Sequence, residues 1–221
     1  MNFMKTPSVL SLLALLSFVA PSLSAAPDPS LSGQVVFVDG DVSANGRDVD
    51  TGDSLTGPNI IKTGEASTVE ILFGGRNIFR LGPKSIVRID FSELKKTVNL
   101  DQGEFTSVLK KLARTAGDAA FVLKTPTVNA GVRGTSFHVM VNDNSTYFCT
   151  CNGSVMLDDG KPAELVQLTN AHHGARVFTK QADGSIAVTV AGLQGHTDAD
   201  LETLANRVGY NLDWTKPDLN H

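Results

Sequence analysis

The sequence predicts an all-β domain, built from many short strands and followed by one short α-helix. Short runs of β-branched and apolar residues recur from Gly33 to Leu157, and many of them alternate with period two, as half-buried strands do. Turn dipeptides such as Asp39-Gly40 and Asn45-Gly46 separate these runs. Helical periodicity is weak until the end of the chain. We therefore expect a Gly-rich β-roll or solenoid-like domain, or a β-sandwich.

The predicted strands share this composition and short length. They include Gln34–Val38, Val69–Phe73, Asn77–Leu81, Ile86–Ile89, Thr97–Leu100, Phe121–Leu123, Ser136–Val141 and Ser154–Leu157. Alternation along Ser136–Val141 directs His138 to the side opposite Phe137, so we expect His138 to face solvent.

One helix is predicted over residues 198–208. Thr197-Asp198-Ala199-Asp200 resembles a capping box with Asp in place of Glu, and Gly209 supplies a stop. Leu201, Leu204 and Ala205 then fall on one face. We expect this face to pack on the β domain and to cover an open edge or end of its sheet. Trp214 is expected to be a packing anchor.

The N-terminus predicts export. Lys5 is followed by an apolar run from Val9 to Ala20 and then by small residues, as in a secretory signal peptide. Cleavage is expected near Ser24 or Ala25, in a periplasmic or secreted protein; an uncleaved N-terminal anchor is the alternative. The run is shorter than the about 20 residues that span a bilayer. No later segment is apolar enough to span one, so the mature chain is expected to lack a membrane span.

The length and net charge of the chain limit its possible functions and its division into segments. The chain has 221 residues and a net charge of −4, and it lacks a long basic stripe, which argues against nucleic-acid binding. We expect a signal peptide at 1–24, a mobile leader at 25–32, a β domain at 33–157 and a C-terminal extension at 158–221. The extension is expected to contain a β-hairpin and the helix.

Three stretches of the β domain point to a known family. They are Gly40–Ser43 with Gly52–Leu55 and Ile61–Ser67; Val69–Phe73 with Phe79–Ser85; and Leu100–Glu104 with Phe121–Phe137. Together they resemble the FecR domain. The most specific element is formed by Thr125, Pro126, Gly131, Arg133, Gly134 and Thr135. Pro126 favours an extended Thr125, and the glycines allow a bend or a close approach of strands.

The resemblance implies a periplasmic β-rich module. In the founding regulators this module senses an outer-membrane receptor and controls a sigma factor through a membrane span and a cytoplasmic tail. We expect neither a cytoplasmic anti-sigma segment nor a separate membrane helix here. A binding or scaffold role, with another envelope protein as partner, is therefore the expectation. Arg133 is expected to cap carbonyls or to pair with a carboxylate. The alternative is that Arg133 is exposed and recognises a partner protein.

Two cysteines and three histidines form a candidate metal site. Cys149 and Cys151 are two residues apart on a predicted strand, so both sulfurs face one side. His172 and His173 follow in a turn-like setting, and His196 precedes the helix cap. Thiolate and imidazole together favour zinc, copper or iron ions. A four-ligand site would use both cysteines, one of His172 and His173, and His196.

Other readings of the cysteines stay open. In an oxidising compartment they could form a local disulfide, which would indicate redox activity, or they could be inert thiols. The sequence has no serine elbow, zinc-protease helix motif or phosphate loop, so a non-enzyme is expected. The leading function is a non-catalytic binding, scaffold or sensory module of the envelope. The alternative is a metal-binding or redox-active protein.

Overall fold

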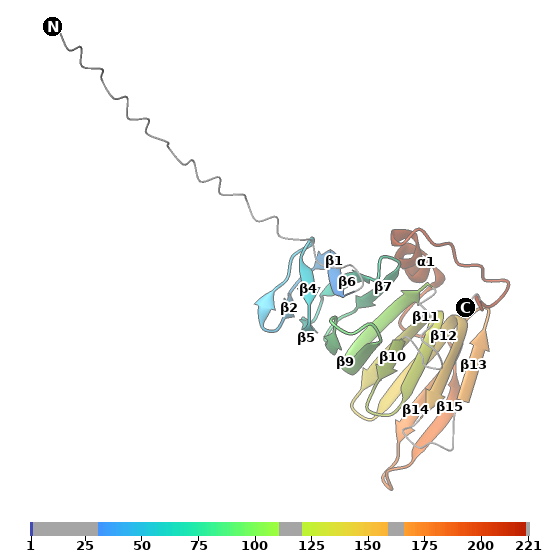
Figure 1. The fold of residues 1–221 in the computed structure, drawn as a ribbon. Helices are drawn as coiled ribbons and strands as arrows, with labels where there is room; N and C mark the ends of the chain where they lie inside the picture. Colours follow the sequence, from blue (N-terminus) through green and yellow to red (C-terminus); the bar gives the residue numbers. More distant parts are fainter. Residues whose placement is uncertain (2–30, 111–120, 159–165, 220–221) are drawn as a thin grey trace.

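The computed structural model describes residue 1 and residues 31–110, 121–158 and 166–219 (Figure 1). Residues 2–24 of the predicted signal peptide, and the predicted leader up to residue 30, lie outside the described residues. Within the described residues there are fifteen strands and one α-helix, which confirms the all-β prediction with a C-terminal helix. In this part of the chain, no helix is both long and apolar enough to cross a bilayer.

The strands are short in the first half of the chain and longer in the second. They are β1 (Ser32–Asp39), β2 (Val42–Ala44), β3 (Arg47–Asp48), β4 (Ser54–Thr56), β5 (Pro58–Thr63), β6 (Thr68–Phe73), β7 (Asn77–Leu81), β8 (Ile86–Asp90), β9 (Lys96–Leu109), β10 (Phe121–Lys124), β11 (Asn129–Asn142), β12 (Ser145–Asp158), β13 (Val166–Asn170), β14 (Gly174–Lys180) and β15 (Ile186–Ala191).

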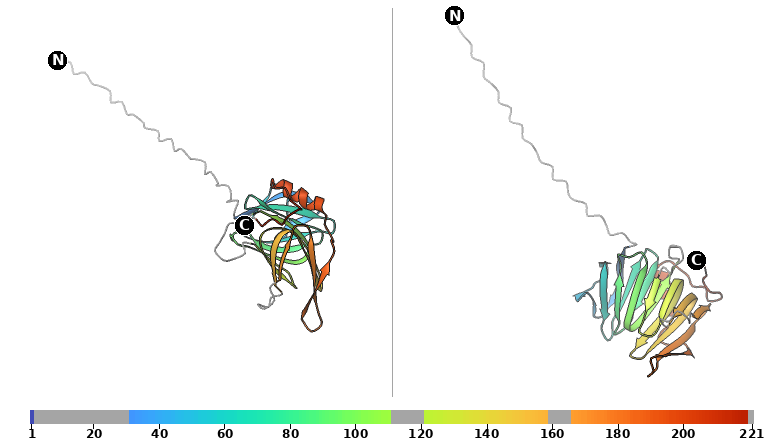
Figure 2. Two further views of the ribbon diagram at one scale, coloured as in Figure 1. Left: turned by 90° about the vertical axis from the view of Figure 1, so that its right-hand side faces the viewer. Right: turned by 60° about the horizontal axis from the view of Figure 1, so that its bottom comes forward.

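All fifteen strands belong to one hydrogen-bonded sheet. Its main order is β15-β14-β12-β11-β10-β9-β7-β6-β1-β4, and β2, β3, β5, β8 and β13 branch from it. Only the pairing of β10 with β9 is parallel among the described strands. Figure 2 shows the strands side by side in a curved sheet. A single curved sheet corresponds to the predicted roll rather than to a sandwich of two sheets.

The central strand β9 changes partners half-way along its length. Its first half pairs with β8 and β10, and its second half pairs with β7 and β11. Gly103 lies at this change with a φ of 90°. A Cβ atom on Gly103 would lie 2.4 Å from the Cα atom of Ser85. The bend in β9 therefore requires glycine both for its backbone conformation and for space.

Substituting this glycine tests the bend. We expect Gly103→Ala to lower the free energy of unfolding by about 1–3 kcal/mol. The alanine would be strained at this positive φ, and its Cβ atom would also clash with the backbone of Ser85. Gly46→Ala is the matched control for the conformation alone, since Gly46 also has positive φ but open space around it. Urea unfolding should show a clearly larger loss for Gly103→Ala, and equal losses would contradict a steric role.

Phenylalanines fill the inner side of the curved sheet. A chain of ring contacts joins five strands, with centroids 5.1–5.9 Å apart. Its members are Phe73, Phe79, Phe105, Phe137 and Phe148. Phe121 of β10 contacts Phe73 at 6.0 Å, although β6 and β10 are not neighbours in the sheet. The sheet must therefore curl for these rings to meet, and their burial stabilises the curl.

The FecR-like element predicted as a bent junction is a hairpin turn followed by a bulge. Thr125 closes the turn between β10 and β11, where its N–H donates to the Val128 carbonyl at 3.0 Å. The β11–β12 register then shifts between Val132 and Thr135. Gly134 has a φ of 129°, and Thr135 Oγ1 donates to the Ser154 carbonyl at 2.7 Å. Arg133 is exposed on this bulge.

The C-terminal extension continues the sheet. β14 pairs with β12, and β15 pairs with β14, so the predicted hairpin is integrated with the preceding strands. The helix α1 spans Asp198–Arg207, and its N-cap Thr197 and Asp200 form the predicted capping box. Its contacts are with β7 and β9. Both are inner strands of the sheet, so the helix packs on them and does not cover an edge strand (Figure 1).

Candidate functional site

The C-terminal segment, defined here as residues 192–219, covers the outer face of the sheet. A second apolar cluster, separate from the phenylalanine core, joins it to the strands. Leu201, Leu204 and Ala205 of α1 are each 0% exposed. This apolar packing encloses several polar side chains between the segment and the sheet.

Four of these side chains converge on one point. Cys149 and Cys151 lie on β12, His173 in the turn before β14, and His196 in the loop before α1. One ligand atom from each lies within 4.8 Å of all the others. The Cys149 and Cys151 Sγ atoms are 3.6 Å apart, and both cysteines are free thiols. We call these four residues the Cys/His cluster.

The strand pairing of β12 brings His173 to the thiols. β12 pairs with β14 over residues 145–150 and with β13 over residues 153–157, so the turn between β13 and β14 passes beside Cys151. The His173 N–H donates to the Cys151 carbonyl at 3.0 Å. His173 adopts a φ of 40°, which is unfavourable for a residue with a side chain, and the cluster therefore contains local strain.

His196 approaches the sheet because a glycine precedes it. Gly195 has a φ of 71°, and a Cβ atom there would lie 2.5 Å from the Met140 Sδ atom. His196 Nδ1 is 2.8 Å from the Gln194 carbonyl and must donate to it, since a carbonyl only accepts. The lone pair of His196 Nε2 is therefore directed at the cluster, 3.2 Å from Cys151 Sγ.

Asp198 orients His173. The His173 Nε2 atom lies 2.6 Å from a carboxylate oxygen of Asp198 and donates to it, which leaves Nδ1 facing the cluster. Asp198 also accepts from His172 Nε2 at 3.0 Å. Its position in the first turn of α1 suits a carboxylate, because the helix dipole is positive there. Trp214 stacks on the His173 ring at 5.3 Å.

The two thiols have opposite electrostatic environments. The hydrogen bond from Cys151, with further contributions from His173 and His196, outweighs burial and lowers the pKa of Cys149 to about 4. Burial raises the pKa of Cys151, and Cys149 raises it further. Hydrogen bonds with Cys149 and Asp198 outweigh burial to raise the pKa of His173. The two shifts favour the thiolate form at Cys149 and the thiol form at Cys151.

His172 is the predicted site residue that lies outside the cluster. Its side chain is 50% exposed, whereas that of His173 is 11% exposed. His172, His173 and Asp198 form a second group of close donor atoms, but mutual hydrogen bonds already satisfy it. The structure therefore selects His173 from the two adjacent histidines.

His138 was predicted to face solvent, and this prediction is wrong. It is 1% exposed, its Nδ1 atom lies 2.8 Å from Thr106 Oγ1, and its ring stacks on His196 at 4.3 Å. Burial lowers its pKa to about 3. The outer face of β11 has the polar pattern of a solvent face, but the C-terminal segment covers it. Local alternation contains no signal for that cover.

Asn152 is a second residue that sequence reasoning missed. It is 1% exposed beside Cys151, and its side-chain amide donates to the carbonyls of Asp213 and Lys216. Its side-chain oxygen accepts from the Asp218 N–H at 2.8 Å. Asn152 therefore fastens the end of the C-terminal segment to the strand that carries both cysteines.

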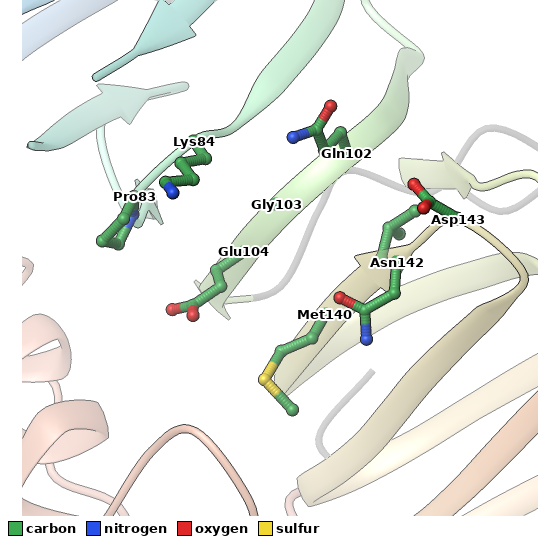
Figure 3. A pocket seen from close by; sticks show the side chains of 9 residues that line it. Pro83, Lys84, Gln102, Gly103, Glu104, Met140, Asn142 and Asp143 are labelled. Carbon is green, nitrogen blue, oxygen red and sulfur yellow. The ribbon is translucent and has the colours of Figure 1, made fainter. Parts of the chain in front are cut away.

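A shallow pocket of about 320 Å³ is lined by residues 83–84, 102–104 and 140–143, outside the Cys/His cluster. Figure 3 shows Lys84, Glu104, Asn142 and Met140 around it. Burial raises the pKa of Glu104. Met140 pairs in register with Glu104, and its sulfur meets Gly195, so the pocket ends where the C-terminal segment begins. Its charged groups do not converge on a point as those of the cluster do.

Comparison with known proteins identifies the β domain. Residues 59–156 match the family model described as "FecR protein". This part of the chain is similar to FecR domains. Two crystal structures of a "putative anti-sigma factor" from Parabacteroides distasonis ATCC 8503, at 2.50 and 1.65 Å resolution, are similar to it with 18% identity and a TM-score of 0.48. The similarity covers 62% of each chain in the first case and 61% in the second. No curated protein matches the sequence.

The FecR match divides the cluster. Cys149 and Cys151 lie inside residues 59–156, whereas His173, His196 and Asp198 lie beyond them. The cluster is therefore assembled from the region that matches the FecR model and from the residues that follow it.

Proposed function

We propose that this chain is a non-catalytic sensory module of the cell envelope, in which the Cys/His cluster is the sensing element. The FecR match supports a signalling or sensory role. The predicted signal peptide supports a periplasmic or secreted location. The regulatory role that the FecR resemblance implies supports a non-catalytic function, and another envelope protein is the proposed partner.

One observation carries this proposal: the cluster draws its side chains from two parts of the chain, the FecR-like strands and the C-terminal segment. Cys149 and Cys151 belong to the region that matches the FecR model, and His196 belongs to the C-terminal segment. A ligand held by both parts stabilises the docked segment by its own binding free energy. Occupancy of the cluster would thereby control which surface the domain presents to a partner.

Capture from cross-linked cell envelopes tests the proposal. The bait is the tagged exported chain, compared with Leu204→Asp, which places a charge at a fully buried position of α1 and undocks the segment. Asn206→Asp is the matched control, because Asn206 is exposed on the same helix. We expect one envelope protein to be captured equally by the wild type and the control, and several-fold differently by Leu204→Asp.

Two outcomes would contradict the proposal. One is the absence of any envelope protein enriched over an unrelated exported bait. The other is equal capture by all three chains while far-UV circular dichroism shows an intact β domain and proteolysis shows a released C-terminal segment in Leu204→Asp.

A further inference from the structure

We propose that Cys149, Cys151, His173 and His196 form a tetrahedral site for a zinc-class divalent ion, ligated by two Sγ atoms, His173 Nδ1 and His196 Nε2. This inference names the ligand of the proposed sensor, but it rests on the geometry of the cluster and stands independently of any envelope partner.

The spacing of the four atoms has the dimensions of such a site. Zn–S bonds of about 2.3 Å and Zn–N bonds of about 2.0–2.1 Å give tetrahedron edges of about 3.8 Å for S···S, 3.3–3.4 Å for N···N and 3.6 Å for S···N. The observed S···S distance is 3.6 Å and the N···N distance is 3.3 Å. Two S···N distances are 3.6 and 3.2 Å. Four of the six edges therefore lie within about 0.4 Å of those of a zinc tetrahedron, and the other two are no longer than 4.8 Å.

Proton positions favour a cation at the centre. His196 Nδ1 donates to the Gln194 carbonyl, and His173 Nε2 donates to Asp198. The remaining ring nitrogens therefore face one another across 3.3 Å beside the two sulfurs. A positive charge between these atoms is favourable, and either a shared proton or a metal ion can supply it. A metal ion supplies that charge to all four ligand atoms at once.

The surroundings match those of protein metal sites. A histidine ligand commonly donates its second ring nitrogen to a carboxylate or a carbonyl, which sets its tautomer and orientation. Asp198 accepts such a hydrogen bond from His173, and the Gln194 carbonyl accepts one from His196. Cys149 and Cys151 are 0% exposed and His196 is 7% exposed, so water is largely excluded.

The donor set selects the class of ion. Two thiolates and two imidazoles in tetrahedral array favour zinc, whereas calcium and magnesium require oxygen ligands. Protein atoms would fill all four coordination positions of the ion, which is the arrangement of a structural rather than a catalytic zinc site. The ion would tie the C-terminal segment to β12, because His196 comes from the segment and both sulfurs come from the strand.

Metal titration of the mature full chain tests the site. The protein is purified with a thiol reductant, stripped with a chelator and titrated with Zn²⁺ or Co²⁺ alone. We expect one ion per chain by elemental analysis. With Co²⁺ we expect the visible bands of tetrahedral cobalt together with thiolate-to-cobalt charge-transfer absorption.

Adjacent residues provide matched variants. His173→Gln should weaken Zn²⁺ binding by more than the about 10–100-fold loss that Asp198→Asn should cause as an outer partner. His172→Gln, one residue away, should bind within a few-fold of wild type. Cys149→Ser should also weaken the charge-transfer band, because one of its two sulfur ligands is lost. Circular dichroism of each stripped variant establishes that the β domain is folded.

Three results would overturn the inference. They are substoichiometric binding with octahedral cobalt spectra, equal affinities for the His172→Gln and His173→Gln variants, and failure to bind metal by a fully reduced chain whose two thiols are confirmed by thiol titration. If the metal binds as expected and no envelope partner is found, the site stands and the sensory role falls.

Discussion

Replacing Phe137 by alanine is expected to lower the free energy of unfolding by about 3–5 kcal/mol, the usual cost of removing a buried aromatic ring. Phe137 is 0% exposed and contacts Phe105, Phe121 and Phe148 at centroid distances of 5.6–6.1 Å. Its removal leaves a cavity at the centre of the ring contacts that hold the sheet in its curl. Urea unfolding followed by circular dichroism measures the loss.

Leu94→Ala is the control for this prediction. Leu94 is 70% exposed and lies outside the strands, so its truncation should change stability by no more than about 0.5 kcal/mol. A loss below about 1 kcal/mol for Phe137→Ala would mean that the phenylalanine contacts do not hold the sheet in this shape.

Replacing Arg80 by methionine is the second change with a large expected effect, a loss of about 3 kcal/mol in the free energy of unfolding. Glu70 is 1% exposed and accepts from Arg80 Nε at 3.0 Å and from Nη2 at 2.8 Å. Its other oxygen pairs with Arg207 of α1. Without Arg80, a buried carboxylate keeps only one partner, and burial of a poorly compensated charge is costly.

Arg88→Met provides the matched control, because the Arg88–Asp101 pair has the same contact distance of 2.8 Å but is exposed. Exposed pairs contribute about 0–1 kcal/mol. The Glu70→Gln/Arg80→Met double variant, which lacks the buried charge, should recover part of the loss. Equal stabilities of Arg80→Met and Arg88→Met in urea unfolding would refute a structural role for the buried pair.

Patterns within short windows predicted the local structure well. Period-two runs such as Val69–Phe73 are strands, and the capping box at Thr197 begins the helix. These features are visible in sequence because neighbouring residues determine strand alternation and helix capping. The curl of the sheet was not visible in the same way, since it depends on rings such as Phe73 and Phe121 that meet across the fold.

The candidate site shows the same division. The sequence alone determined that two thiols face one side of a strand, that a pair of histidines follows in a turn, and that His196 precedes a capped helix. Only the tertiary structure decided that His173 and not His172 joins the thiols, that Asp198 orients it, and that His138 is buried. The physical reason is that the C-terminal segment covers the outer face of the sheet, and a contact between residues about 45 positions apart leaves no mark on the local pattern of either.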